Sequence, residues 1–311
     1  MVGDDGFHGV AMKVTTMRQS AEGFEVQLTS DVRFGAAGIN FSGQYGTPAA
    51  RDLLMDVYAP VGADPEAKRR AVVLAFGGAY HRGSKEDDSF EDGRNTPIAE
   101  YCRVLAGRGF VCFSLDYRLT SEDPDPGPDR VLIDPEGVSR SRVDHVRTLL
   151  GLAPATSRMI ADGMEAAAAD VATGLRFVHA NATRFGVDPD RITAGRFSAG
   201  GTSALYAVLG HGAPANGIIA LSGRLEMRDI PRHMRDAGQP PILQFVAEND
   251  LEHVSRLTPV MQARSTEVGL RHRVLRVPRA GHFYPRSAEV VDADGRVSTV
   301  EAEMLSFIDS L

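Results

Sequence analysis

The sequence predicts an α/β fold in which helices cover both faces of a mostly parallel central sheet. After about residue 50, short β-rich runs alternate with segments long enough to form helices, which is typical of a parallel sheet. Two of these runs, 72–76 and 218–221, are continuously apolar, as strands are when both faces of the sheet are covered. The chain has 311 residues, of which 43% are hydrophobic and 24% charged, so it can bury a large core in one domain.

Seven strands are expected from runs of β-branched, aromatic and aliphatic residues. They cover residues 53–58, 71–76, 110–117, 192–197, 217–222, 241–247 and 273–277. The clearest helix is expected over residues 164–185. Its apolar side chains follow one another at steps of four and three and so form one stripe: Val171, Leu175, Val178, Ala182 and Phe185. Gly186 would end this helix, and residues 188–190 would form the turn into the next strand.

Two regions lie outside this alternation. Residues 1–50 contain one hairpin-like piece, 24–34, and are expected to form an extra sheet edge or a flap over the site, whereas residues 51–311 form the main domain. Residues 119–160 begin with the turn-dense acidic run 121–129, whose prolines exclude a core strand. This region is either a solvated loop or the start of a small cap insertion that covers and shapes the pocket.

The composition favours a small-molecule partner. A net charge of −7 and an isoelectric point near 5.7 disfavour binding to nucleic acid or to an anionic membrane, since both require a basic surface. No stretch resembles a secretory signal or a membrane span, so a cytoplasmic location is expected. The sequence leaves the oligomeric state open, a homodimer included.

Neither metal nor disulfide chemistry is expected. The two cysteines, Cys102 and Cys112, are too few for a disulfide framework and are expected to be small buried side chains. No group of histidine, cysteine and acidic residues has the sequence spacing of a metal site. We therefore expect the protein to work without a metal or another cofactor.

The most informative segment is 193–201, which places Ser198 between an expected strand and an expected helix. Gly200 and Gly201 follow the serine. This arrangement is typical of the nucleophile elbow, in which a sharp turn exposes the serine hydroxyl and the next N–H faces a developing oxyanion. Two positions before the serine stands Arg196, where the GxSxG pattern has glycine.

A nucleophilic serine needs a base and an orienting acid, and candidates for both follow Ser198 in the sequence. Asp250 comes after an expected strand, at the end where open α/β sheets place their sites. Glu248 and Glu252 lie close enough in sequence to compete for this role. His282 follows the last expected strand and is preceded by glycine, so it is the expected base.

The loop 76–84, which follows an expected strand, would supply the oxyanion site. Its paired glycines let main-chain N–H groups turn toward a substrate carbonyl oxygen. The expected donors are the N–H groups of Gly78, Ala79 and Ala199. The other expected substrate-binding residues flank these donors or the serine: Gly77, Tyr80, His81, Arg196 and Phe197.

Several segments of the chain resemble the motifs of one enzyme family. Residues 76–79 (FGGA) are similar to its HGGG oxyanion motif, and residues 115–119 (LDYRL) resemble its DYRLAPE segment. Residues 185–192 and 198–201 together resemble its FGxDPxRI and GxSAGG run. Over residues 50–311, the chain is therefore similar to the α/β-hydrolases of the carboxylesterase and hormone-sensitive-lipase-like group.

This resemblance implies an α/β-hydrolase fold and a serine hydrolase that cleaves small carboxylic esters. Ser198 would form an acyl-enzyme, with His282 as general base and then general acid, and Asp250 would orient the histidine. Two alternatives stay open because one fold hosts many functions. The first is an amide or peptide hydrolase, or a lyase or cyclase, and the second is a non-catalytic ligand-binding protein. A candidate residue for every position of the triad argues against the second.

Two residues depart from the family pattern. Phe76 stands where the oxyanion motif has histidine, which removes a hydrogen bond that usually braces the loop. Arg196 stands where the elbow usually has glycine. Three interpretations of Arg196 are open. Its side chain runs over a face of the sheet to an acid, it shapes and charges the floor of the pocket, or the elbow is reoriented and catalyses hydrolysis poorly or not at all.

Overall fold

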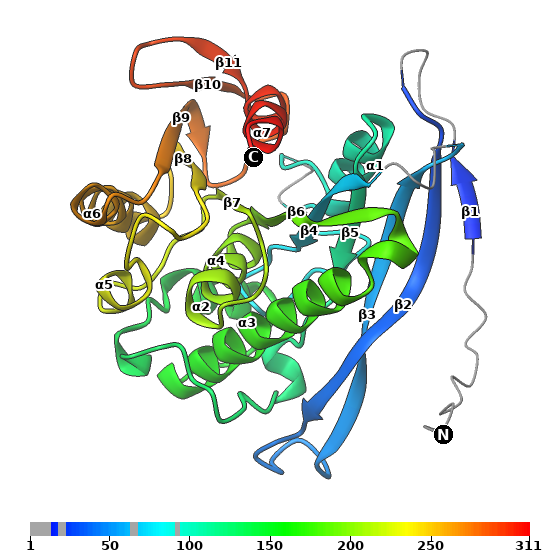
Figure 1. Ribbon diagram of the computed structural model, residues 1–311. Coiled ribbons are helices and arrows are strands. Elements are labelled where there is room, and N and C mark those ends of the chain that lie inside the picture. The colour runs from blue at the N-terminus through cyan, green and yellow to red at the C-terminus, as the bar shows by residue number, and fades with distance from the viewer. Residues whose placement is uncertain (1–13, 18–22, 63–67, 91–93) are drawn as a thin grey trace.

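Eleven strands form one sheet in the computed structural model, which describes residues 14–17, 23–62, 68–90 and 94–311 (Figure 1). They are β1 (Val14–Met17), β2 (Val26–Ile39), β3 (Ala49–Pro60), β4 (Arg69–Ala75), β5 (Val111–Leu115), β6 (Val187–Phe197), β7 (Gly217–Leu221), β8 (Ile242–Asn249), β9 (His272–Gly281), β10 (Glu289–Val291) and β11 (Val297–Thr299). The strand order is β1-β2-β3-β5-β4-β6-β7-β8-β9-β10-β11. Pairing is parallel from β5 to β9 in this order and antiparallel at both edges.

Helices connect the parallel strands and cover the sheet. The described α-helices are α1 (Ile98–Gly107), α2 (Ser141–Leu149), α3 (Ser157–Ala180), α4 (Ala199–Leu205), α5 (Asp229–His233), α6 (Glu252–Val268) and α7 (Val300–Asp309). The long helix α3 lies across one face of the sheet, where it packs against α4 (Figure 1). No helix in the described ranges has the length and apolar character needed to cross a bilayer.

All seven expected strands are present, as β3 to β9, and the predicted α/β class is confirmed. Strands β4 and β7 contain the two continuously apolar runs, and β5 and β7 are buried along their whole length. This burial follows from their central places in the sheet, where helices cover both faces. Cys102 and Cys112 are free and fully buried, as expected, with their sulfur atoms 2.9 Å apart.

The expected helix 164–185 differs from α3 at both ends. Helix α3 begins seven residues earlier, because the Thr156 hydroxyl accepts a hydrogen bond from the N–H of Met159 and caps the first turn. The last expected residues instead form a short 3-10 helix, η3 (Ala182–Phe185), which ends at Gly186 with a φ of 62°. The expected turn at 188–190 is wrong, because these residues belong to β6. They lie where the register of pairing between β6 and β4 shifts.

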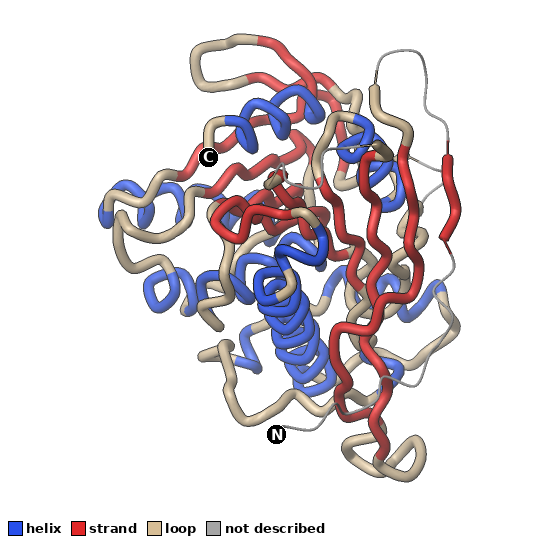
Figure 2. The backbone as a smooth tube through the Cα atoms, turned by 45° about the vertical axis from the view of Figure 1, so that its right-hand side comes forward, coloured by secondary structure: helices blue, strands red, loops and turns tan. Residues whose placement is uncertain are grey.

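The hairpin-like piece at 24–34 is part of a larger unit. Strand β2 continues to Ile39 and pairs antiparallel with β3 through two register shifts. The two strands form a long hairpin that reaches beyond the rest of the sheet (Figures 1 and 2). The described part of the N-terminal region therefore extends the sheet edge, and residues 1–13 and 18–22 lie outside the described residues.

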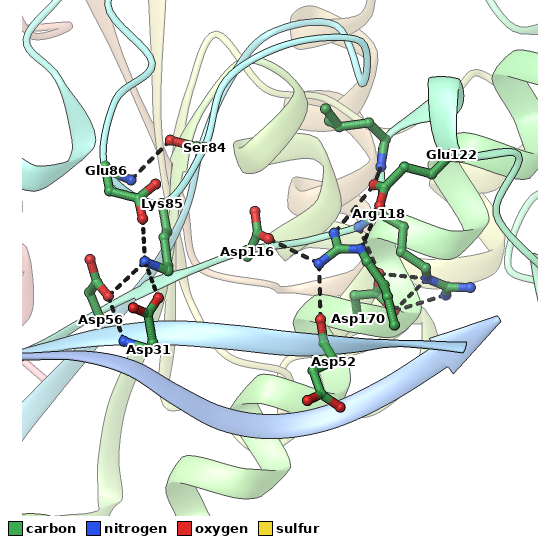
Figure 3. Close-up of polar contacts among 12 residues, drawn as sticks. Asp31, Asp52, Asp56, Ser84, Lys85, Glu86, Asp116, Arg118, Glu122 and Asp170 are labelled. Atoms are coloured by element: carbon green, nitrogen blue, oxygen red, sulfur yellow. Dashed lines mark hydrogen bonds and ion pairs between the residues drawn. The ribbon is translucent and has the colours of Figure 1, made fainter. Parts of the chain in front are cut away.

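Buried cations tie this hairpin to the body of the protein. Arg118 donates to both carboxylate oxygens of Asp170 on α3, at 2.8 and 2.9 Å (Figure 3). The same guanidinium donates to the carbonyl oxygens of Gly38 in β2 and Asp125, at 2.8 and 2.7 Å. One side chain thus joins the end of β2, the loop after residue 119 and α3.

A second buried cation, Lys85, fills a cluster of three carboxylates. Oxygen atoms of Asp31, Asp56 and Glu86 lie within 4.8 Å of one another. The Lys85 ammonium lies 2.9 Å from Asp31 and 2.8 Å from Asp56, and it also pairs with Glu86 (Figure 3). The cluster is therefore an ion-pair network that holds β2 and β3 against the loop 81–90, and the lysine takes the place that a metal ion would need.

Removing Asp170 should destabilise the fold strongly. The Asp170→Ala substitution leaves the Arg118 charge buried and unpaired, which costs about 3–5 kcal/mol of the free energy of unfolding. Denaturant unfolding followed by circular dichroism measures this loss. The matched control is Asp52→Ala, which breaks a pair with Arg33 whose side chains are 52% and 53% exposed and should cost less than about 1 kcal/mol. Equal losses for the two substitutions would contradict the assignment.

Candidate active site

Ser198 lies in a strained turn between β6 and α4. Its φ of 54° and ψ of −118° are rare for a residue with a side chain, and its N–H donates to the carbonyl of Leu221 at 2.7 Å. Space is tight on the other side of the turn, because a Cβ on Gly200 would lie 1.9 Å from the carbonyl oxygen of Ala75. This contact explains the small residues after the serine, as the sequence pattern indicates.

The structure brings Ser198, His282 and Asp250 together in one hydrogen-bonded chain. The Nε2 atom of His282 lies 2.9 Å from the hydroxyl oxygen of Ser198, and its Nδ1 atom lies 2.6 Å from a carboxylate oxygen of Asp250. The three residues come from the carboxyl ends of β6, β8 and β9, which lie at the same edge of the sheet. Nδ1–H can therefore donate to the carboxylate while Nε2 accepts from the serine hydroxyl.

Hydrogen bonds hold the Asp250 carboxylate in this position. It accepts from the Ser222 hydroxyl at 2.5 Å and from the N–H groups of Ala247 and Leu251 at 3.0 and 2.8 Å. Burial raises the pKa of Asp250, but its bonds to His282, Ser222 and Ala247 outweigh burial and lower the pKa below the usual range. The group is therefore ionised at neutral pH.

Neither competing glutamate occupies the place of Asp250. Glu248 is exposed and accepts from the N–H of Arg279 at 2.6 Å, and Glu252 begins helix α6. Ser222, which the sequence did not indicate as a site residue, donates to Asp250 and lies 3.0 Å from the Tyr284 hydroxyl. Its position at the carboxyl end of an expected strand is the signal that could have found it.

The expected oxyanion loop has a left-handed backbone. Gly78, Ala79 and Tyr80 have φ values of 126°, 56° and 62°. Only glycine fits the first position, because a Cβ there would lie 1.9 Å from the carbonyl oxygen of Arg82. Within the described residues, the N–H groups of Gly78, Ala79 and Ala199 make no hydrogen bond, so they are available to an oxyanion.

Other contacts brace this loop in place of the histidine that Phe76 replaces. The Phe76 ring stacks on Tyr117 with centroids 4.0 Å apart, and the Tyr117 hydroxyl donates to the Phe76 carbonyl at 3.0 Å. The next N–H, that of Gly77, donates to the buried carboxylate of Asp88 at 2.8 Å. The loop is thus held from two sides without the usual histidine.

Arg196 does not contact the pocket, which corrects the expectation that it binds substrate. Its side chain is 1% exposed, pairs with Asp88 and donates to the carbonyl of Thr96. The guanidinium carbon also lies 5.0 Å from the ring centroid of Tyr101. Burial lowers the pKa of Arg196 to about 9, so the group stays charged at neutral pH. The structure fits the first of the three interpretations, in which the Arg196 side chain runs over a face of the sheet to an acid. That acid is Asp88.

A small cavity of about 40 Å³ opens beside Ser198. Ala79, Tyr80 and Ala199 form one part of its wall. Residues from the region 119–160 form another part: Val138, Ser139, Arg142, Val143 and Ile160. A wider cavity of about 550 Å³ lies on the side of His282 and shares Arg142 and Leu251 with the first.

The remaining expected binding residues are His81, Phe197 and Gly77, which contact residues of the site. Nδ1 of His81 lies 2.8 Å from the carbonyl oxygen of Ala79, and its Nε2 lies 3.2 Å from Nη1 of Arg147 in α2. Burial lowers the pKa of His81, so its ring is neutral. The Phe197 ring packs 5.1 Å from the His282 ring. Neither His81 nor Phe197 is among the described residues that line the cavity at Ser198, and Gly77 is not among them either.

No protein-family model matches the chain, and no curated protein matches it. Solved structures of esterase 2 (Est2) from the planctomycete Thermogutta terrifontis are similar to it. The native esterase shares 21% identity over 84% of this chain and 86% of that chain, with a TM-score of 0.55. The paraoxon-phosphorylated form shares 21% over 84% and 88%, with a TM-score of 0.56. The propionate-bound form shares 22% over the same fractions, with a TM-score of 0.55. This likeness and the strand order show that the chain has the α/β-hydrolase fold.

Proposed function

We propose that the protein is a serine hydrolase that cleaves small carboxylic esters through an acyl-enzyme. The observation that carries this proposal is the chain of hydrogen bonds from Asp250 through His282 to Ser198, with separations of 2.6 and 2.9 Å. Acyl transfer also needs a positioned nucleophile and donors for the oxyanion. Ser198 lies in a strained turn, close to main-chain N–H groups that make no hydrogen bond within the described residues. The structurally similar Est2 is named an esterase, and one of its structures is phosphorylated by paraoxon.

Each group has one role in the proposed reaction. As the Ser198 oxygen attacks the ester carbonyl, Nε2 of His282 takes its proton, and Asp250 stabilises the resulting imidazolium. The N–H groups of Gly78, Ala79 and Ala199 would donate to the oxyanion of the tetrahedral intermediate. His282 then gives the proton to the leaving alcohol. In the second half of the reaction, His282 takes a proton from a water molecule as the water oxygen attacks the acyl carbonyl. His282 then gives this proton to the Ser198 oxygen as the bond between the serine and the acyl group breaks, which releases the acid.

The two cavities suggest which part of the ester each would hold. The acyl group stays on Ser198, beside the cavity of about 40 Å³, which has room for roughly three water-sized groups. The leaving oxygen receives its proton from His282, so the alcohol would extend toward the wider cavity. We therefore propose a substrate with a short acyl chain and a larger alcohol. Est2 structures contain propionate and butyrate.

None of these observations favours an amide hydrolase, a lyase or a cyclase over an ester hydrolase. A purely ligand-binding protein would not need a carboxylate, an imidazole and a serine hydroxyl in one hydrogen-bonded chain.

Replacing Ser198 should abolish turnover without unfolding the protein. The Ser198→Ala variant lacks the nucleophile, so hydrolysis of p-nitrophenyl acetate and covalent labelling by a phosphonate should both disappear. Its melting temperature should stay within a few degrees of the parent value. Mass spectrometry of the labelled parent protein identifies the modified residue. A label on Ser203 or Ser222 would show that the nucleophile is wrongly assigned.

Loss of the Ser222 hydroxyl should slow the reaction moderately. The Ser222→Ala variant removes one of the bonds that hold the Asp250 carboxylate, while the bonds from Ala247 and Leu251 remain. We expect kcat to fall about tenfold, equivalent to roughly 1.4 kcal/mol of barrier, with little change in KM. The control is Ser265→Ala, which removes a hydroxyl that donates to the carbonyl of Gln262 in α6, away from Asp250. Equal kinetics in the two variants would contradict a positioning role for Ser222.

Acyl length should decide which esters are good substrates. In a series of p-nitrophenyl esters, kcat/KM should be highest from acetate to butyrate and at least about tenfold lower for decanoate, because the cavity excludes a long chain. Met164→Ala, which removes a side chain from the wall, should move the optimum to longer chains. Met227, which is exposed, provides the control variant Met227→Ala. A flat profile, or a preference for decanoate in the parent protein, would exclude the proposed acyl cavity.

A further inference from the structure

Arg196 has a backbone conformation that side chains rarely adopt. Its φ is 126°, a value usual for glycine, and it stands two residues before Ser198. A large residue persists at such a position only when surrounding contacts hold it there. The contacts of its guanidinium must therefore stabilise this backbone conformation.

The polar contacts of the guanidinium lie in the part of the chain between the oxyanion loop and α1. The guanidinium pairs with the Asp88 carboxylate and donates to the carbonyl of Thr96. The Tyr101 ring, 5.0 Å away, covers the group. Because Arg196 is 1% exposed, its charge needs these partners, and it reaches no substrate.

Asp88 also binds the oxyanion loop, and so connects Arg196 to it. The carboxylate oxygen that pairs with Arg196 also accepts from the N–H of Gly77, at 2.8 Å. Its other oxygen accepts from the N–H of Ile98, at 2.8 Å, which fixes the carboxylate at the start of α1. Gly77 directly precedes Gly78, the first proposed oxyanion donor. The position of that donor therefore depends on Asp88.

We propose that Arg196 and Asp88 form a buried ion pair that positions the oxyanion loop relative to the nucleophile. Arg196 is then a positioning residue that acts through Asp88 and Gly77, and it replaces the bracing that the loop loses with Phe76 in the histidine position. The pair fixes both halves of the site, because one partner belongs to the elbow of Ser198 and the other holds the loop. This inference rests on the proposed ester hydrolysis.

The test compares Arg196→Gly, which restores the residue usual in the family, with the parent protein. If glycine only relieved backbone strain, turnover would stay equal or rise. We expect kcat for p-nitrophenyl acetate to fall at least tenfold with less than a threefold change in KM, because oxyanion donors act mainly in the transition state. Arg33→Ala, at an exposed pair, is the control and should match the parent.

Hydrogen exchange supplies a readout that needs no enzymatic activity. Peptides that cover residues 76–84 should exchange faster in Arg196→Gly than in the parent, whereas peptides from α6 should not change. Asp88→Asn should accelerate exchange in the same peptides. The double variant should lose clearly less activity than the product of the two single losses, since both substitutions remove the same interaction. Fully multiplicative losses, or unchanged exchange in residues 76–84, would overturn the proposal.

Arg196→Lys keeps the inference testable if the glycine variant does not fold. Lysine retains the charge but lacks the forked donors that reach both Asp88 and the Thr96 carbonyl. We expect an intermediate kcat and intermediate exchange, and parent-like values for both would overturn the proposal. A parent protein that hydrolyses no ester would refute the proposed function instead, and the exchange data would still decide whether Arg196 holds the loop.

Discussion

The close approach of α4 to the end of β4 is the constraint on which the rest of the site depends. No side chain fits at Gly200, because the Ala75 carbonyl oxygen would lie 1.9 Å from its Cβ. This approach allows the chain to leave β6, turn sharply at Ser198 and enter the helix, and the next N–H makes no hydrogen bond to the described part of the chain. Asp250 and His282 then need only to follow neighbouring parallel strands, because those strands end at the same edge of the sheet.

Buried cations hold the loops around this edge. Lys85, Arg118 and Arg196 are each almost inaccessible to solvent, and each pairs with a carboxylate from a distant part of the chain. A buried pair of this kind adds little net stability, but the loss of one partner is costly. Such pairs therefore specify one arrangement of the loops rather than simply strengthening the fold. The long β2–β3 hairpin (Figure 3) and the expected oxyanion loop are both held in this way.

The sequence predicted the parallel sheet and placed the candidate nucleophile, base and acid on residues that the structure brings together. These features depend on local patterns: apolar runs, small residues at a turn, and polar residues that follow strands. The patterns could not reveal the partner of Arg196, because Asp88 lies 108 positions away in the sequence and meets it only in the fold. The turn expected at 188–190 is instead an irregularity within β6, where the pairing with β4 jumps from Val187 to Ile192 and the N–H of Asp190 donates to the carboxylate of Asp188.

The contact between His81 and α2 has a consequence for engineering. His81 lies 2.8 Å from the Ala79 carbonyl oxygen and 3.2 Å from Arg147, so it links the oxyanion loop to the region that also lines the cavity. Selectivity is usually redesigned by exchanging such a wall segment while the catalytic scaffold is left alone. In this protein the two are not separable modules. A grafted segment without an equivalent of Arg147 would change the support of the oxyanion loop together with the shape of the cavity, so designed libraries should keep that arginine fixed.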